Sequence, residues 1–130
     1  MLNIEEKYQQ ALDYLYSFVD YSLTRQLRYS ADKFNLDRMR KLMRFLGDPQ
    51  RQYPIVHVAG TKGKGSTAAM IANILRTAGY LTGFYTSPHL QDFTERIQVN
   101  GEPISHEMLV QLVDRIKPFV QQVEEITTFE

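Results

Sequence analysis

The stretch "YPIVHVAGTKGKGSTAAM", residues 53–70, decides the fold of this chain. Its first part, 53–60, is short, apolar and rich in β-branched residues, and it ends at a glycine, which predicts a buried strand. Residues 60–65 then hold three glycines and two lysines. From 66 to 78 the apolar residues recur at helical spacing, and Gly79 fits the position just after a helix. The stretch therefore predicts a strand, a glycine-rich turn and a helix in succession.

The glycine-rich turn has the chemistry of an anion site. A helix start leaves about four N–H groups unpaired at the positive end of the helix dipole, and glycines let the backbone wrap an anion there. Lys64 could reach the outer phosphates of a nucleotide, and Ser66 adds a hydroxyl. The strict pattern G-x-x-x-x-G-K-[ST] is not met, because Val58 stands at its first glycine and Gly65 follows the lysine. The alternative, a flexible turn without a ligand, explains poorly why glycines should weaken a helix start.

The remaining elements complete an α/β fold. Further helices are expected over 4–19, 36–46 and 105–118, and further strands over 80–87 and 95–105, the last with an Asn-Gly turn. Asn35 is the expected N-cap of the second helix and Gly47 its end, and Pro118 should end or kink the last helix. A strand, a glycine loop, a helix and a second strand form a βαβ unit. The sequence therefore predicts a P-loop-type parallel sheet flanked by helices.

Length and composition exclude several classes of protein. The chain has 130 residues, about one domain, and its 15 basic and 15 acidic residues give a net charge of zero, which argues against nucleic-acid binding. It has no cysteine, so disulfides and thiolate metal sites are excluded. There is no signal-peptide pattern and no run of about 18 apolar residues, so we expect a cytoplasmic protein without a membrane partner.

Three stretches, taken in order and spacing, carry a resemblance to a known family. They are "VAGTKGKGST" at 58–67, "SPHL" at 87–90 and "ERIQVNGEPIS" at 95–105. With them, the chain resembles folylpolyglutamate synthase/dihydrofolate synthase of the Mur-ligase superfamily, from "FNLDRMRKLMRFLG" at 34–47 to the final "TTFE". The resemblance implies that residues 1–130 are the N-terminal portion of a truncated ATP-binding domain, with the C-terminal glutamate-ligase domain absent.

The resemblance also implies a set of site residues. The ATP phosphate loop would comprise Thr61, Lys62, Gly63, Lys64, Gly65 and Ser66, with Lys64 as the catalytic cation. The pterin pocket would be lined by Lys33, Phe34, Asn35 and Leu36, and by Thr127, Thr128, Phe129 and Glu130. Ser87 would coordinate Mg²⁺, whereas the family's other metal ligands lie beyond the end of this chain. Lys62 is a departure, because the family most often has Asn there.

The residues themselves agree with the resemblance at the metal. Mg²⁺ takes hard oxygen ligands, and the residue after the loop lysine normally supplies a hydroxyl. Gly65 cannot do so, and a ligand must therefore come from elsewhere. Ser87 follows the next predicted strand, and sites in open α/β sheets gather at those strand ends.

The implied function is an ATP- and Mg²⁺-dependent ligase of folate biosynthesis and one-carbon metabolism. Such enzymes join L-glutamate to a folate or dihydropteroate carboxylate through an acyl phosphate. The alternatives are a muramyl-peptide ligase of the same superfamily, a non-catalytic nucleotide-binding module and a small-molecule kinase. Family members are expected to be monomeric. The isolated chain should be inactive, and with an open sheet edge and uncovered apolar surface it should self-associate.

Several charged and histidine side chains have simpler interpretations. His57 alternates within the predicted strand and should be a hydrogen-bonded core residue, while His106 should be solvated. His89 could contact a ligand or make a structural hydrogen bond, and Glu95 and Arg96 could reach the active site or form a local ion pair. The basic residues between 38 and 44 alternate with apolar ones, which favours a solvated helix face over a nucleic-acid patch.

Overall fold

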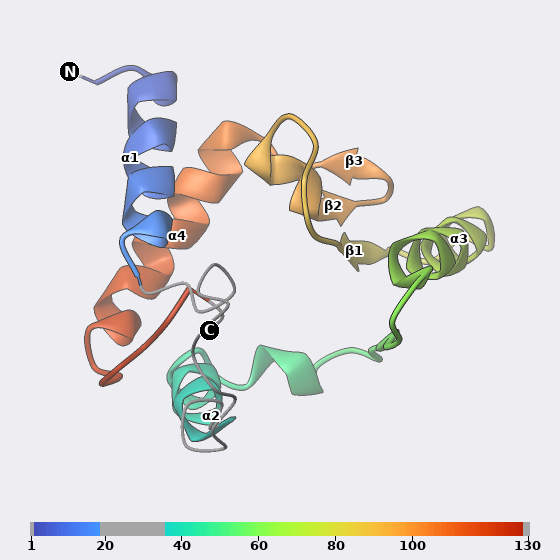
Figure 1. The fold of residues 1–130 in the computed structure, drawn as a ribbon, viewed down its shortest axis with the longest axis horizontal. Coiled ribbons are helices and arrows are strands. Elements are labelled where there is room, and N and C mark those ends of the chain that lie inside the picture. Colours follow the sequence, from blue (N-terminus) through green and yellow to red (C-terminus); the bar gives the residue numbers. More distant parts are fainter. Residues whose placement is uncertain (1, 19–35, 129–130) are drawn as a thin grey trace. The chain divides into compact units, whose positions relative to one another are not determined.

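The structure is a computed structural model that describes residues 2–18 and 36–128 (Figure 1). Its helices are α1 (Ile4–Tyr16), α2 (Leu36–Phe45), α3 (Lys64–Thr77) and α4 (His106–Val120), with 3₁₀ turns η2 (Pro49–Arg51) and η3 (Phe93–Arg96). Its strands are β1 (Gly83–Tyr85), β2 (Ile97–Val99) and β3 (Glu102–Pro103). The chain divides into two compact units, unit 1 (Met1–Ile55 and Val110–Glu130) and unit 2 (Val56–Leu109), and the division falls within α4.

The predicted helices are present, and their ends follow from the local sequence. Asn3 caps α1 in a reciprocal capping box with Glu6. Helices α2 and α3 are each followed by a left-handed glycine, Gly47 with φ 79° and Gly79 with φ 90°. Hydrogen bonds close both ends in the pattern typical of such glycines, for example from the Tyr80 amide to the Leu75 carbonyl at 3.1 Å. The expected N-cap Asn35 lies outside the described residues.

Unit 1 contains an apolar core. Leu42 from α2, Val120 from α4 and Val123 are buried together. Partly buried side chains pack around them: Tyr14, Phe18, Met43, Leu46, Ile116, Phe119 and Ile126. Arg40, Lys41 and Arg44 of α2 are exposed, as the predicted solvated helix face requires, whereas the Arg38 side chain is only 16% exposed. Pro118 was expected to end or kink α4, and it lies inside the helix, which continues for two residues to Val120.

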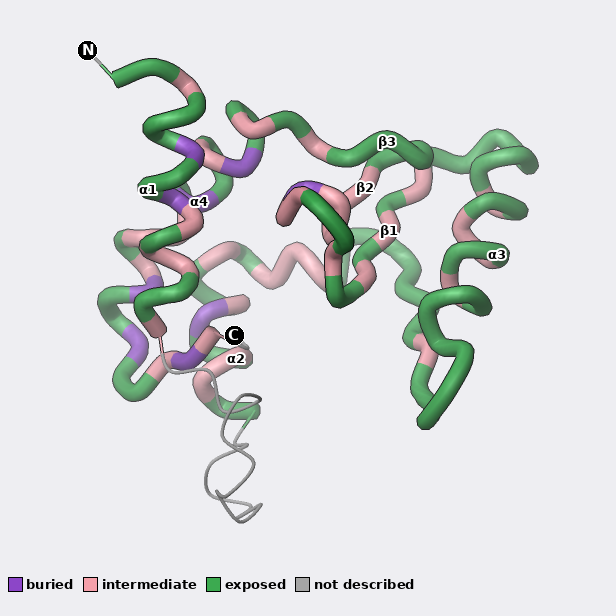
Figure 2. Tube along the Cα trace, turned by 45° about the horizontal axis from the view of Figure 1, so that its top comes forward, coloured by how far each residue is buried: buried purple, intermediate pink, exposed green. Residues whose placement is uncertain are grey.

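Unit 2 contains α3 and an antiparallel sheet in the order β1-β2-β3. Gly83 pairs with Val99 and Tyr85 with Ile97. The predicted Asn-Gly turn joins β2 to β3, with positive φ at Asn100 (51°) and Gly101 (85°). Helix α3 contacts β1, yet neither α3 nor any of the three strands has a buried residue. Figure 2 accordingly shows α3 in green and pink without purple.

The predicted parallel sheet is not formed within the described residues. The stretch 54–60 has no strand, and β1 pairs with β2 alone. A strand requires a partner for its backbone groups, and β-rich composition predicts propensity but does not supply one. Val56 is accordingly 62% exposed, and His57 is exposed as well, so the prediction of a core histidine at 57 is wrong.

Candidate functional site

The glycine-rich turn leads directly into α3. Gly63 is the N-cap of the helix in a left-handed conformation, with φ 74° and ψ 2°, and no side chain caps the helix there. Gly60 also has a positive φ, 152°. The predicted loop residues Thr61 to Ser66 are all exposed, so the first-turn amides of α3 lie at the protein surface. The result is a helix start whose N–H groups are accessible to an anion.

Lys64 is folded over this turn. Its Nζ donates a hydrogen bond to the carbonyl oxygen of Gly60 at 2.5 Å. A Cβ built on Gly60 would lie 3.8 Å from Cγ of Lys64, so the side chain runs close to the loop backbone. The ammonium group is thus held beside the helix start, where it adds positive charge to that of the dipole.

The end of β1 approaches the same helix start. A Cβ built on Gly65 would lie 3.9 Å from Oγ1 of Thr86, the residue that follows β1. Ser87 is the next residue and is exposed. The structure therefore brings the predicted metal ligand Ser87 and the predicted phosphate loop into the same part of unit 2. Two hydroxyl groups, those of Thr86 and Ser87, follow β1 in succession.

The loop after Ser87 is organised by Glu95. Its Oε2 accepts a hydrogen bond from the Leu90 amide at 2.8 Å, and its Oε1 accepts from the amides of Gln91 (3.0 Å) and Asp92 (2.9 Å). These backbone hydrogen bonds, that from Leu90 first, lower the pKa of Glu95. The ionised carboxylate therefore supports the loop at neutral pH, and this contribution is lost as the pH falls through the lowered pKa.

Arg96 holds the same loop from another side. Its Nε donates to Nδ1 of His89 at 2.8 Å, and its guanidinium lies 5.1 Å from the ring centroid of Phe93. Its carbonyl accepts a hydrogen bond from the Thr86 amide at 3.0 Å. Of the two alternatives for His89, a ligand contact or a structural hydrogen bond, the structure shows the hydrogen bond. The described hydrogen bonds of Glu95 and Arg96 join these residues to the 86–92 loop and not to each other.

A histidine–carboxylate pair links this loop to α4. Nε2 of His106 lies 3.0 Å from Oδ2 of Asp92, whose other oxygen accepts hydrogen bonds from the amide and hydroxyl of Thr94. The prediction that His106 is solvated is therefore wrong, because the loop folds back onto the first turn of α4. Sequence spacing alone offered no signal for a pair separated by 14 residues.

The predicted pterin-pocket residues fall in unit 1 where they are described at all. Thr127 is buried, and the Thr128 hydroxyl donates to the Phe18 carbonyl at 3.0 Å. Leu36 is 62% exposed at the start of α2. Lys33, Phe34, Asn35, Phe129 and Glu130 lie outside the described residues.

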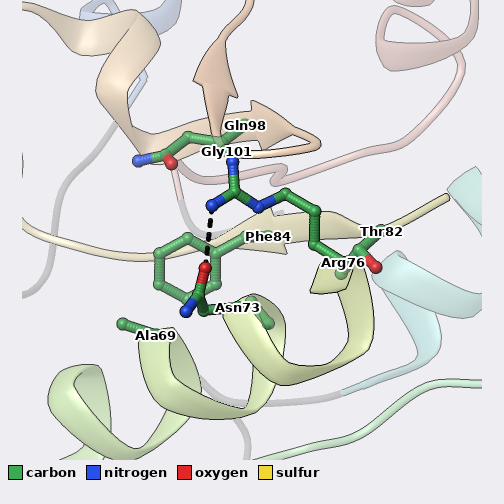
Figure 3. Close-up of a pocket in the computed structure, with 8 residues that line it drawn as sticks. Ala69, Asn73, Arg76, Thr82, Phe84, Gln98 and Gly101 are labelled. Atoms are coloured by element: carbon green, nitrogen blue, oxygen red, sulfur yellow. Dashed lines mark hydrogen bonds between the residues drawn. The ribbon is translucent and has the colours of Figure 1, made fainter. Parts of the chain in front are cut away.

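A cavity that sequence reasoning missed lies between α3 and the sheet (Figure 3). It has a volume of about 200 Å³. Arg76 crosses it, donating to Oδ1 of Asn73 at 2.8 Å and to the carbonyl of Asn100 at 3.3 Å. The absence of a side chain at Gly101 makes room for the guanidinium, because a Cβ there would lie 2.8 Å from Nη1 of Arg76. The only signal in the sequence was that glycine in the hairpin turn.

The described residues contain neither a cluster of metal-binding side chains nor a membrane-spanning helix. Across 2–18 and 36–128, no group of three or more His, Asp or Glu side chains could hold a metal ion. None of the helices described is both long enough and apolar enough to traverse a bilayer.

Comparison of the sequence with known proteins finds one family repeatedly. The chain is 48% identical over 93 residues to a dihydrofolate synthase/folylpolyglutamate synthase of Bacillus subtilis, an alignment that covers 72% of this chain and 22% of the relative. It is 34% identical over 129 residues to folylpolyglutamate synthase of Lacticaseibacillus casei, covering 95% and 28%. No family model matches the chain. The chain thus spans only about a quarter of the length of these relatives.

Solved structures agree with the sequence comparison. Folylpolyglutamate synthase of Mycobacterium tuberculosis complexed with ADP has a TM-score of 0.80 at 33% identity, covering 98% of this chain and 28% of the other. A complex of folylpolyglutamate synthase (FPGS) with AMPPCP and folate has a TM-score of 0.79 at 34% identity, covering 94% and 29%. The described fold is therefore that of part of these proteins.

Proposed function

This chain belongs to the folylpolyglutamate synthase/dihydrofolate synthase family, and on that premise we propose that it is the ATP-binding part of a folate-glutamate ligase. The ligase would join L-glutamate to a carboxylate of folate or dihydropteroate at the expense of ATP. The observation that carries the proposal is the uncapped start of α3, with Gly63 in the left-handed conformation and the Lys64 ammonium folded beside it. Related structures with ADP and with AMPPCP and folate support the nucleotide and the substrate class.

The phosphate loop would bind the nucleotide by its backbone. Amides at the start of α3 donate to phosphate oxygens, and the exposed hydroxyls of Ser66 and Thr67 lie in the same turn. Lys64 offsets the charge that spreads over the transferring phosphoryl group, a role that needs an ammonium near the helix start. Lys62 adds a second cation on the exposed loop.

The donor set suits Mg²⁺ in part. Mg²⁺ prefers oxygen ligands, retains several waters and is commonly held by one or two protein groups together with substrate phosphates. Ser87 is exposed and directly follows Thr86, whose Oγ1 would lie 3.9 Å from a Cβ built on Gly65 at the start of α3. Ser87 would thus hold the ion, which when bound would neutralise phosphate charge. This chain's own contribution is a single hydroxyl ligand kept in place.

The chemistry would proceed through an acyl phosphate. The substrate carboxylate oxygen attacks the γ-phosphorus of ATP and ADP leaves. The amine of glutamate then attacks the acyl carbon, phosphate leaves, and the amine loses a proton as the amide forms. The pterin would be bound by residues of two segments: Lys33, Phe34, Asn35 and Leu36, and Thr127, Thr128, Phe129 and Glu130.

A second candidate applies to the 130 residues on their own. They span 22% and 28% of two relatives, so the isolated chain would bind nucleotide without turning it over. Ligase activity would then require the remaining length of such a relative. ATP binding to the isolated chain is common to both candidates and can be measured directly.

Calorimetric titration of the 130-residue chain with ATP and Mg²⁺ tests the proposal. Lys64→Ala should weaken binding by about 10- to 100-fold, because a charge-assisted hydrogen bond contributes about 1.5–3 kcal/mol. Lys41→Ala, which removes an exposed lysine of α2, is the matched control and should leave affinity unchanged. Wild-type protein that binds no ATP, or equal affinity in the Lys64 and Lys41 variants, would refute the proposed site.

A further inference from the structure

Ser87 lies between two tethered points of the chain. On one side, the Thr86 amide donates to the carbonyl of Arg96 at 3.0 Å. On the other side, Nδ1 of His89 accepts from Nε of Arg96 at 2.8 Å. Arg96 therefore holds the chain on both sides of the serine, at Thr86 through its backbone and at His89, two residues after Ser87, through its side chain.

The next three residues are held by the adjacent carboxylate. Glu95 accepts three backbone N–H groups, those of Leu90, Gln91 and Asp92, at 2.8–3.0 Å. The loop has little apolar burial to fix it, since Leu90 is 92% exposed and Ser87 itself is exposed. Where packing is absent, hydrogen bonds to a charged group are the strongest constraint that remains.

We propose that Glu95 and Arg96 are positioning residues that hold the Ser87 hydroxyl beside the start of α3 for a nucleotide-bound Mg²⁺, an inference that rests on the proposed function. Neither side chain touches the ion or the nucleotide. Each acts through the loop, as outer partners of metal ligands commonly do, and loss of such partners typically weakens metal binding about 10- to 100-fold.

The geometry predicts a graded series of variants. In Glu95→Gln the amide oxygen can still accept from Gln91 and Asp92, but the NH₂ group would face the Leu90 amide, donor against donor. Glu95→Ala loses all three bonds. Arg96→Lys keeps the charge but removes the planar Nε–H that meets His89. Glu102→Gln is the control, because it removes an equal charge from an exposed position on β3.

The first measurement needs no ligand. Hydrogen exchange of the Leu90, Gln91 and Asp92 amides should accelerate at least tenfold in Glu95→Ala, less in Glu95→Gln, and not at all in Glu102→Gln. Exchange of α3 amides should be unchanged in every variant, which shows that unit 2 is folded. Unchanged exchange at residues 90–92 in Glu95→Ala would overturn the proposal.

The second measurement separates positioning from general structure. The Mg²⁺ concentration that half-saturates ADP-loaded protein should rise about tenfold in Glu95→Ala and Arg96→Lys, while ADP affinity in EDTA stays at the wild-type value. If a variant lost ADP affinity equally with Mg²⁺ and in EDTA, the positioning role would be overturned. If wild-type protein binds nucleotide with no Mg²⁺ dependence, the metal site itself is refuted. If the wild type depends on Mg²⁺ but the variants behave like it, only the positioning role is refuted.

Discussion

Units 1 and 2 bury their apolar residues to different degrees. In unit 1, Leu42, Val120 and Val123 are buried together, each no more than 7% exposed. In unit 2, Met70 and Ile74 of α3 are 60% and 67% exposed, and no residue of α3 or of the sheet is buried. Apolar residues recur at helical spacing in both α2 and α3, so spacing predicts a helix without predicting what covers it.

Unit 2 relies instead on hydrogen bonds in its turns. The Glu95 carboxylate holds three amides, Asp92 and Glu95 form a capping box around η3, and Asn100 binds the Thr82 amide through its side chain at 2.9 Å. Such contacts fix local geometry without burying apolar surface. Although Leu109 at the end of unit 2 is buried, the sheet and the loops around the candidate site are thus shaped by polar contacts, and unit 1 by packing.

The largest expected effect is in the core of unit 1. Leu42→Ala should lower the free energy of unfolding by about 2–5 kcal/mol, because it leaves a cavity in a packed cluster. The same substitution at Leu75, half-buried on α3, should have a smaller effect. Urea unfolding followed by far-UV circular dichroism measures both.

An exposed leucine on α2, the helix that contains Leu42, is the control for the substitutions at Leu42 and Leu75. Leu36→Ala on α2, where the leucine is 62% exposed, should change the free energy of unfolding by less than about 0.5 kcal/mol. If Leu75→Ala were as destabilising as Leu42→Ala, the contrast between the units would be wrong.

Substitution of glycines with positive φ should have the next largest effect on the free energy of unfolding, and it allows the two units to be compared directly. Gly47 in unit 1 has open space around it, so Gly47→Ala should cost about 1 kcal/mol for its backbone conformation alone. Gly101→Ala should cost about 2 kcal/mol, because its methyl group would also meet the Arg76 guanidinium. Thermal unfolding of the two variants gives the difference.

The Arg76 contribution can be isolated by a double-mutant cycle. In an Arg76→Ala background, Gly101→Ala should cost no more than Gly47→Ala, since the clash has been removed. A Gly101→Ala effect that is independent of Arg76 would show that the contact across the cavity does not constrain the hairpin.

Much of the fold could be predicted from sequence where the determinants are local. The ends of α2 and α3 follow from Gly47 and Gly79, the Asn-Gly turn is formed, and the Ser105 hydroxyl, at the first residue of the helix expected over 105–118, accepts from the Met108 amide. The strand predicted at 53–60 failed because pairing is non-local. No pattern within those residues reveals whether a partner strand lies beside them.

The candidate site likewise has features that the sequence predicts and features that it does not. The exposed glycine turn, Lys64 and the position of Ser87 after β1 could all be anticipated from short-range pattern. The anchoring of the loop could be anticipated only in part. The Asp92-x-x-Glu95 spacing is that of a capping box, but the bonds from the Leu90 and Gln91 amides to Glu95 follow no such pattern, and His106 meets Asp92 across 14 residues.

Substitutions in the uncovered apolar surface of unit 2 should change stability least, but they should change the self-association of the chain. Met70, Ile74, Leu81 and Tyr85 are each at least 60% exposed, and among the described residues β1 pairs with β2 alone. At zero net charge there is little repulsion between copies. We therefore expect the 130-residue chain to self-associate as its concentration rises.

Ile74→Lys tests that expectation at a single exposed position. It should change the free energy of unfolding by less than about 0.5 kcal/mol, because the isoleucine packs little in the folded chain, yet it should reduce the mass measured by light scattering at high concentration. Thr77→Lys adds the same charge to an exposed polar position of α3 and should reduce association less. Equal effects of the two variants would show that charge, and not the loss of apolar surface, controls association. A wild-type chain that remains monomeric would show that the exposed face of α3 does not mediate contacts between copies.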